Sequence, residues 1–91
     1  MKYRRTKKFR ECYDELPEEI KEKAKKAFRF FQENPDHPSL RIRKMEGHKD
    51  IWEGHVDIHY CFTFHYEKDE KTDEKICVFR VIGTHKIYDN P

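Results

Sequence analysis

Apolar and polar residues alternate between Gly54 and Tyr66. The even positions carry apolar or aromatic residues, namely Val56, Ile58, Tyr60, Phe62, Phe64 and Tyr66. The odd positions carry His55, Asp57, His59, Cys61, Thr63 and His65. Because strand side chains point alternately to opposite faces, one face of this segment would enter a core, and the other would gather imidazoles, a carboxylate and a thiol. With a tight turn near Asp57 and Ile58, the pattern predicts a hairpin of two strands, 51–56 and 59–67.

Helical spacing replaces this alternation in the first third of the chain. After Thr6, a suitable N-cap, the apolar residues Phe9, Cys12, Tyr13 and Leu16 recur at i, i+3, i+4 and i+7. Pro17 suits the first turn of a second helix. The apolar stripe of that helix is Ile20, Ala24, Ala27, Phe28 and Phe31, and Asn34-Pro35 ends it. The pattern therefore predicts an N-terminal helical hairpin.

The remaining elements are strands. Residues 2–5 are expected to form a short first strand, and residues 40–45 a strand with Leu40 and Ile42 inward. Residues 76–82 are apolar apart from Arg80, which is typical of a central strand. Together these predict one α+β domain over 1–91, with the helical hairpin on one face of a small, mainly antiparallel sheet of four to five strands.

The two faces of this sheet are expected to differ. Tyr60, Phe62 and Phe64 would lie under the helices. His55, His59, Cys61 and His65 would lie on or near a face left open, which makes that face the place to look for chemistry.

The composition is unusually charged for a folded chain. Of the 91 residues, 42% are charged and 35% hydrophobic, but the net charge is only +2 and 14% are aromatic at regular spacing, which favours a folded domain. Residues 1–45 have a net charge of +6 and residues 46–91 a net charge of −4. The basic half suits a polyanionic partner, although lysine-rich helix surfaces would give the same imbalance.

The cysteines indicate a reducing compartment. Cys12, Cys61 and Cys77 are odd in number and form no CxxC pair, and the chain has neither a signal peptide nor an apolar run that could span a bilayer. We therefore expect reduced thiols in a cytoplasmic protein.

Several short motifs follow one another in a defined order along the chain. They are Leu16-Pro17, residues 34–41, Met45-Glu46-Gly47, Ile51-Trp52, Tyr60 with Phe62 and Phe64, and Val81-Ile82-Gly83-Thr84-His85 with Tyr88. This order resembles the RelE/ParE superfamily of bacterial toxins from type II toxin–antitoxin pairs. Each motif alone is unspecific, but their order covers nearly the whole chain.

The resemblance implies a function. Most characterised members of this family are ribosome-dependent endoribonucleases that cut mRNA without a metal or other cofactor. The 2′-hydroxyl of one nucleotide attacks the adjacent phosphate, arginine and lysine stabilise the charge, and His, Glu or Tyr side chains move protons. A neighbouring antitoxin usually silences the toxin, so a toxin that is monomeric alone would form a hetero-oligomer with it.

Four residues are predicted to be catalytic on this basis. His85 and Tyr88 match the family's late catalytic positions, and His55 falls where many members have Lys or Arg. Cys61 falls where the ribonucleases have an arginine, and a thiol offers a phosphate almost none of the donors of a guanidinium. Arg80 is therefore predicted to take that place.

A second set is predicted to bind RNA or its phosphates. Its members are Arg41, Arg43, Lys44, His59 and Lys86. Arg41 and Arg43 would also be alternatives to Arg80.

Two other interpretations stay open. Cys61 in place of an arginine would suit a non-enzymatic relative, such as a DNA gyrase poison or an inactive binding module on the same fold. His55, His59, Cys61 and His65 also have the ligand chemistry of a transition-metal site, but the hairpin turn divides the set, and we predict no metal.

Overall fold

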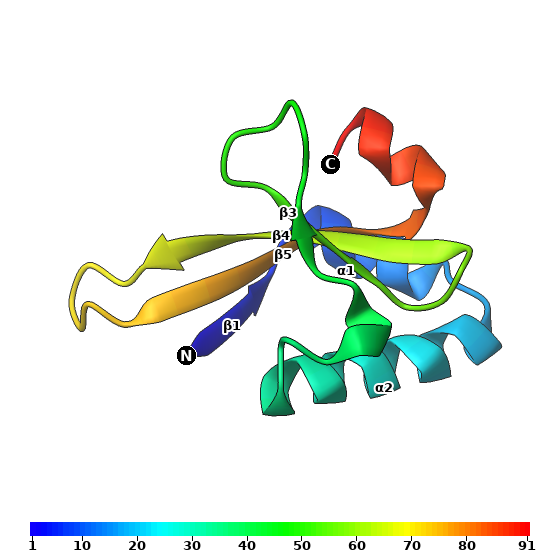
Figure 1. Cartoon of the computed structure of the whole chain (residues 1–91), viewed down its shortest axis with the longest axis horizontal. Helices are drawn as coiled ribbons and strands as arrows, with labels where there is room; N and C mark the ends of the chain where they lie inside the picture. Colours follow the sequence, from blue (N-terminus) through cyan, green and yellow to red (C-terminus); the bar gives the residue numbers. More distant parts are fainter.

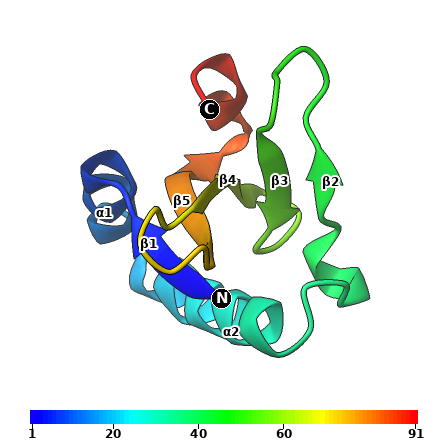
Figure 2. The ribbon, with the colours of Figure 1, turned by 90° about the vertical axis from the view of Figure 1, so that its left-hand side faces the viewer.

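The two helices of the chain lie against one face of a five-stranded sheet (Figures 1 and 2). The computed structural model describes all 91 residues. The elements in chain order are β1 (Lys2–Arg5), α1 (Lys7–Asp14), α2 (Glu18–Glu33), the 3-10 helix η1 (Pro38–Leu40), β2 (Arg43–Lys44), β3 (Trp52–His55), β4 (Tyr60–Lys68), β5 (Lys75–Thr84) and the 3-10 helix η2 (His85–Asp89). The strand order is β1-β5-β4-β3-β2, and only the β1–β5 pair is parallel. The predicted α+β fold with N-terminal helices is confirmed.

Local signals set the helix ends. The hydroxyl of Thr6 accepts a hydrogen bond from the backbone N–H of Phe9 at 3.0 Å and so caps α1. Glu18 and Glu19 lie in the first turn of α2, where the positive end of the helix dipole favours them. Asn34 leaves the helical conformation before Pro35, and α2 ends there.

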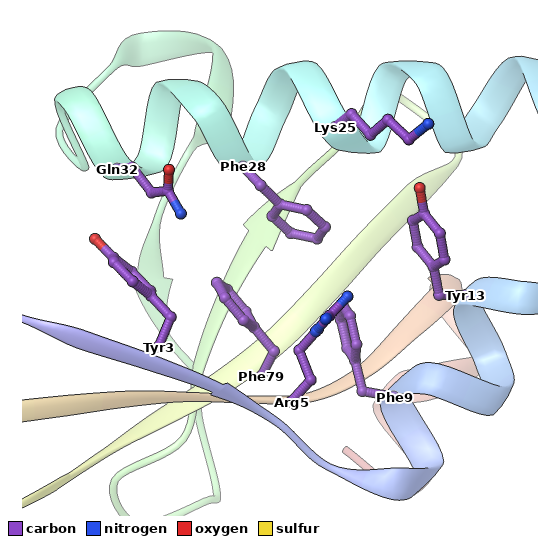
Figure 3. A pocket seen from close by; sticks show the side chains of 8 residues that line it. All are labelled: Tyr3, Arg5, Phe9, Tyr13, Lys25, Phe28, Gln32 and Phe79. Atoms are coloured by element: carbon purple, nitrogen blue, oxygen red, sulfur yellow. The ribbon is translucent and has the colours of Figure 1, made fainter.

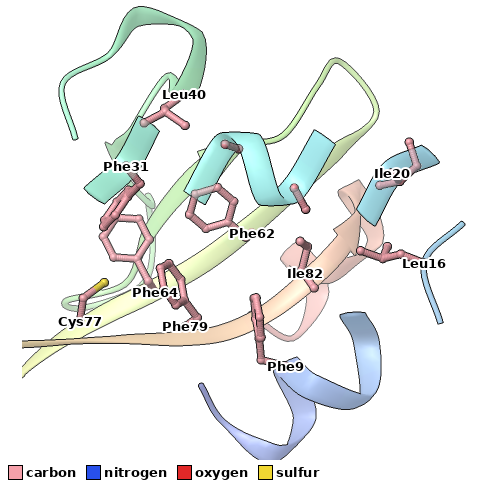
Figure 4. Packing of buried hydrophobic residues seen from close by; sticks show 12 residues of the cluster. Phe9, Leu16, Ile20, Phe31, Leu40, Phe62, Phe64, Cys77, Phe79 and Ile82 are labelled. Atoms are coloured by element: carbon pink, nitrogen blue, oxygen red, sulfur yellow. The ribbon is translucent and has the colours of Figure 1, made fainter. Parts of the chain in front are cut away.

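The core lies between the helices and the sheet (Figure 4). Phe62, Phe64 and Phe79 of the sheet meet the rings of Phe28 and Phe31, with ring centroids 5.0–6.3 Å apart. Such edge-on and tilted pairs add to the free energy gained from burial. Phe62 and Phe64 therefore lie under the helices as predicted, and Tyr60 packs at the margin of the core.

A β-bulge changes the register of β5. Thr63 is opposite Val81, but Phe64 is opposite Phe79, so Arg80 is an extra residue in the ladder. Val81 therefore shares the face of Thr63, and Ile82 shares the helix-covered face with Phe62.

The sheet face turned away from the helices is called the far face below. Its residues include Glu53, His55, Cys61, Thr63, His65, Val78 and Val81. We expected this face to be open, and that prediction was wrong in part, because Cys61, Thr63, Val78 and Val81 are buried. The segment after β5 folds back over this side of the sheet, opposite the helices (Figure 1).

The predicted strand over 40–45 is also shorter than expected. Leu40 is buried but belongs to η1, and Arg41 adopts a left-handed backbone conformation with φ of 45°. Only Arg43 and Lys44 pair with β3. The 3-10 helix takes Leu40, and the left-handed conformation of Arg41, its C-cap, interrupts the extended backbone before β2.

None of the helices is long and apolar enough to cross a membrane.

Candidate active site

Three predicted catalytic side chains meet at one end of the far face. His55 lies at the end of β3, and His85 and Tyr88 belong to η2. The ring centroids are 6.5 Å apart for His55 and His85, and 5.5 Å apart for His85 and Tyr88. Because η2 begins directly after β5 ends at Thr84, His85 lies at the rim of the sheet and is exposed to solvent.

A charged groove, with two basic and two acidic residues in its lining, adjoins this cluster. Its volume is about 370 Å³, and it is lined by Arg43, Lys44, Met45, Glu46, His48, Glu53 and Tyr88. Tyr88 therefore belongs to both the groove and the cluster. Arg43 and Lys44, two of the predicted phosphate-binding residues, line the groove from β2.

Glu53 is a member of this site that the sequence interpretation missed. Its side chain is only 3% exposed and forms an ion pair with Arg43, which lies directly opposite it in the β2–β3 ladder. The alternating pattern, extended back beyond Gly54, would have identified Glu53. Glu53 occupies an odd position, like His55, and an acidic residue in so short a strand is unusual.

The electrostatic surroundings favour a neutral imidazole at His55. Burial lowers the pKa of His55 below 6.5, and the positive charge of Arg41 lowers it further. Glu53 opposes this, while His85 and Arg43 add to the lowering. Nδ1 of His55 is buried without a hydrogen-bond partner, which leaves Nε2 as the nitrogen able to exchange a proton with a substrate.

His85 and Tyr88 are held in different ways. Nε2 of His85 lies 3.2 Å from the carbonyl oxygen of Ile58, and because a carbonyl only accepts, Nε2 carries the proton. Burial raises the pKa of the Tyr88 phenol, and Cys61 and Glu53 raise it further. Tyr88 is therefore a hydrogen-bond donor at neutral pH.

Cys61 is enclosed next to this cluster. It is 0% exposed, and its Sγ lies 3.9 Å from the carbonyl oxygen of Thr84. Burial raises the pKa of its thiol. A side chain at this position would have to move the C-terminal segment in order to reach a substrate.

Arg80 lies outside the cluster. Its Nη1 donates to Nδ1 of His65 at 2.8 Å, and its Nε donates to the carbonyl oxygen of Pro91 at 3.3 Å. The predicted replacement of the missing arginine by Arg80 therefore has no support in the contacts of its guanidinium.

The other predicted RNA-binding residues surround the site at different distances. Arg41 is exposed, and its positive charge is close enough to His55 to lower the pKa of the imidazole. Lys44 is also exposed, and its Nζ lies 3.9 Å from Oδ1 of Asp50. His59 and Lys86 are exposed, on the β3–β4 loop and on η2 respectively. The structure thus brings His55, His85, Tyr88, Arg41 and Arg43 to one end of the molecule.

No group of three or more His, Cys, Asp or Glu side chains is arranged to hold a metal ion. Of the odd-numbered side chains that suggested ligand chemistry, His55 and Cys61 are opposite each other in the β3–β4 ladder, but Cys61 is buried and His65 is hydrogen-bonded to Arg80 and Glu67.

A larger cavity, the aromatic groove, lies on the helix side of the sheet (Figure 3). Its volume is about 490 Å³, and it is lined by Tyr3, Arg5, Phe9, Tyr13, Lys25, Phe28, Gln32 and Phe79. Its polar groups are two phenols, a guanidinium, an ammonium and an amide, and it contains no histidine, cysteine or carboxylate.

Comparison with known proteins identifies the fold. No family model and no curated protein sequence matches the chain. A YoeB/ParE toxin from Agrobacterium tumefaciens superposes with a TM-score of 0.72 at 13% identity, covering 93% of this chain and 99% of the toxin. The RelB–RelE antitoxin–toxin complex from Methanococcus jannaschii gives 0.69 at 22%, covering 97% and 99%. YafQ from E. coli gives 0.68 at 15%, covering 94% of each chain. The chain therefore has the RelE/ParE-like toxin fold that the motif order predicted.

Proposed function

We propose that this chain is the toxin of a type II toxin–antitoxin pair, and that it is a metal-independent, ribosome-dependent endoribonuclease that cleaves mRNA. The observation that carries the proposal is the cluster of His55, His85 and Tyr88 beside a charged groove lined by Arg43 and Lys44, on a fold that solved toxins share. Two imidazoles and a phenol next to arginine are the groups that RNA cleavage without a metal needs.

The proton transfers follow from the surroundings of each group. Neutral His55 takes the proton of the 2′-hydroxyl through Nε2 while the 2′-oxygen forms its bond to phosphorus. The bond from phosphorus to the 5′-oxygen breaks, and His85, acting as the imidazolium, gives that oxygen the proton of Nδ1 while its Nε2–H stays on the carbonyl oxygen of Ile58. The products are a 2′,3′-cyclic phosphate and a 5′-hydroxyl end. Tyr88 donates a hydrogen bond to the reacting phosphate.

The charge of the pentavalent transition state requires cations. Arg43 and Lys44 line the groove next to Tyr88, and Arg41 lies near His55. Lys86 and His59 extend this positive or proton-donating surface along the path of the RNA. One fixed donor of this kind contributes about 10²–10³ in rate.

The partners follow from the same proposal. Two structures with this fold are the RelB–RelE and DinJ–YafQ antitoxin–toxin complexes. This supports a cognate antitoxin as the protein partner, with mRNA on the ribosome as the substrate. Action on the ribosome places the toxin in the cytoplasm.

Expression of the chain alone, with mapping of new 5′ ends in cellular mRNA, tests the proposal. We expect growth arrest, cuts at fixed codon positions, and rescue by a neighbouring open reading frame. His85→Ala should reduce cutting about 10²–10⁴-fold, as expected for loss of an acid–base group. His37→Ala is the matched control, because His37 packs on Phe30 away from the cluster.

A second candidate is a non-enzymatic toxin that poisons DNA gyrase, or an inactive relative. The buried Cys61, at the position where the resembling ribonucleases have arginine, favours it. Arrest with intact mRNA and an induced DNA-damage response would support this candidate and contradict the ribonuclease.

A further inference from the structure

We infer that Glu53 is a positioning residue, whose buried carboxylate holds Arg43 by Nε and presents the two terminal amino groups of that arginine to the scissile phosphate. The inference rests on the proposed function and deepens it. Arg43 would then provide the phosphate with the guanidinium donors that the thiol of Cys61 lacks.

The two partners differ sharply in exposure. The side chain of Glu53 is 3% exposed, whereas that of Arg43 is 75% exposed. A buried carboxylate requires a cation or several donors, because leaving it unpaired in a poorly solvated site is costly. Nε of Arg43 is the donor that the structure provides. The guanidinium is thus fixed at its inner end and free at its outer end.

The β-ladder sets this geometry. Arg43 and Glu53 are directly opposite each other in the two-residue pairing of β2 with β3. Side chains opposite each other across two strands share a face and lie about 5 Å apart at Cβ. The ion pair therefore joins two directly opposed positions of the sheet, and the buried carboxylate holds the long, exposed side chain of Arg43 at its Nε.

The remaining donors of Arg43 suit a phosphate. A guanidinium has five N–H donors, and Nε uses one of them on Glu53. Nη1 and Nη2 have no partner in the structure, and Arg43 lines the groove together with Tyr88. Two parallel N–H groups match two phosphate oxygens, which a lysine ammonium cannot reproduce.

Other charged groups cannot replace this arrangement. Cys61 is enclosed beneath Thr84, and Arg80 is used by His65 and Pro91. The groups that face Glu53 are Arg43 from β2, His55 from β3, Thr63 and Cys61 from β4, and Tyr88 from η2. Among them, Arg43 alone carries a permanent positive charge and two unpaired terminal amino groups.

A double-mutant cycle on mRNA cleavage by programmed ribosomes tests the inference. The variants are Glu53→Gln, Arg43→Ala, their combination, and Arg43→Lys, each checked for folding by circular dichroism. We expect Arg43→Ala to lower kcat about 10²-fold with little change in KM, because the contact strengthens in the transition state. Glu53→Gln, which keeps the shape but removes the charge, should lower kcat about 10-fold alone and cause no further loss in the Arg43→Ala background.

Two comparisons separate positioning from a merely structural ion pair. Arg43→Lys keeps a positive charge opposite Glu53 but loses the two parallel N–H groups of the guanidinium, so the kcat of this variant should stay close to that of Arg43→Ala. Lys44→Ala is the matched control, since Lys44 is the other residue of β2, lines the same groove and ion-pairs with Asp50. The loss of kcat caused by Lys44→Ala should multiply with the loss caused by Glu53→Gln in the double variant, as for two independent residues.

The outcomes distinguish the inference from the function on which it rests. If the wild-type chain cuts no mRNA, the proposed function fails, and the inference fails with it. If the wild type cuts but Arg43→Lys is fully active, or the effects of Glu53→Gln and Arg43→Ala multiply, only the inference is overturned.

Discussion

Arg80 fixes the tautomer of His65. Its Nη1 lies 2.8 Å from Nδ1 of the imidazole, and because a guanidinium can only donate, Nδ1 must accept. The ring proton is therefore on Nε2, which donates to Glu67 at 2.7 Å. Glu67 also accepts from Arg4 at 2.8 and 2.9 Å, so polar contacts connect β1, β4 and β5. Through Pro91, Arg80 links this network to the C-terminal residue.

The network predicts that Arg80 stabilises the fold. Arg80→Ala should lower the free energy of unfolding by about 1–2 kcal/mol, because it removes two partly buried hydrogen bonds and leaves Nδ1 of His65 unpaired. Urea denaturation measures this, with the exposed Arg10→Ala as a control expected within about 0.5 kcal/mol of wild type. Unchanged stability together with lost mRNA cleavage would instead support the catalytic role that the sequence predicted for Arg80.

The β3–β4 hairpin and the helical hairpin could be predicted because their patterns are local. Strict alternation around Phe62 and Phe64 specifies which face of the strand is buried, and the stripe from Ile20 to Phe31 specifies one face of a helix. Both signals come from side-chain spacing within a single element, and tertiary contacts reinforced them.

The errors arose where pairing between distant segments decides the structure. The bulge at Arg80 depends on the register of β5 against Thr63 and Phe64, which alternation within one strand cannot specify. The burial of Cys61 depends on the return of the C-terminal segment after Gly83. Glu53 was missed for a different reason: it has the odd-numbered position of His55, but the alternation was followed back only to Gly54.

Thiol reactivity tests the cover over Cys61. Cys61 and Cys77 are 0% exposed, and burial raises the pKa of both thiols, that of Cys77 to about 12. Since the thiolate is the reactive form, Ellman's reagent should modify only the half-buried Cys12 rapidly in the native protein. Addition of urea should release the other two thiols. Rapid modification of Cys61 at neutral pH without denaturant would show that the C-terminal segment does not enclose it.

Introducing the family's arginine at position 61 should harm the protein. Cys61→Arg would force a large charged side chain into an enclosed site under Thr84, where the nearby Glu53 already pairs with Arg43, and we expect the free energy of unfolding to fall by about 3–5 kcal/mol. Cys61→Ala, which adds no volume or charge, should cost about 1 kcal/mol. Denaturation curves compare the two. A stable Cys61→Arg variant with faster mRNA cleavage would mean instead that position 61 opens to the substrate.

The lowered pKa of His55 predicts that the free energy of unfolding depends on pH just below 6.5, at higher pH than the contributions of the carboxyl groups. Burial, and then Arg41, hold this pKa below 6.5, so the unfolded chain binds the proton more readily than the folded one. The contribution of His55 to the free energy of unfolding is therefore fully present above about pH 6.5. It is lost as the pH falls toward the folded-state pKa, with a slope of at most about 1.4 kcal/mol per pH unit for one proton. The carboxyls with lowered pKa, Asp57, Glu67 and Asp69, have ordinary values near 4 and lose their contribution only at lower pH.

Denaturation at about pH 7.5 and about pH 5.5 measures this effect. His55→Gln should reduce the difference in unfolding free energy between the two conditions. Arg41→Ala should also reduce it, because removing the nearby charge raises the pKa of His55 toward 6.5. An NMR titration of the His55 ring in both the wild type and Arg41→Ala identifies the group responsible. If the pKa of His55 is unchanged by Arg41→Ala, then Arg41 does not face the imidazole, and its proposed place near the reacting phosphate is contradicted as well.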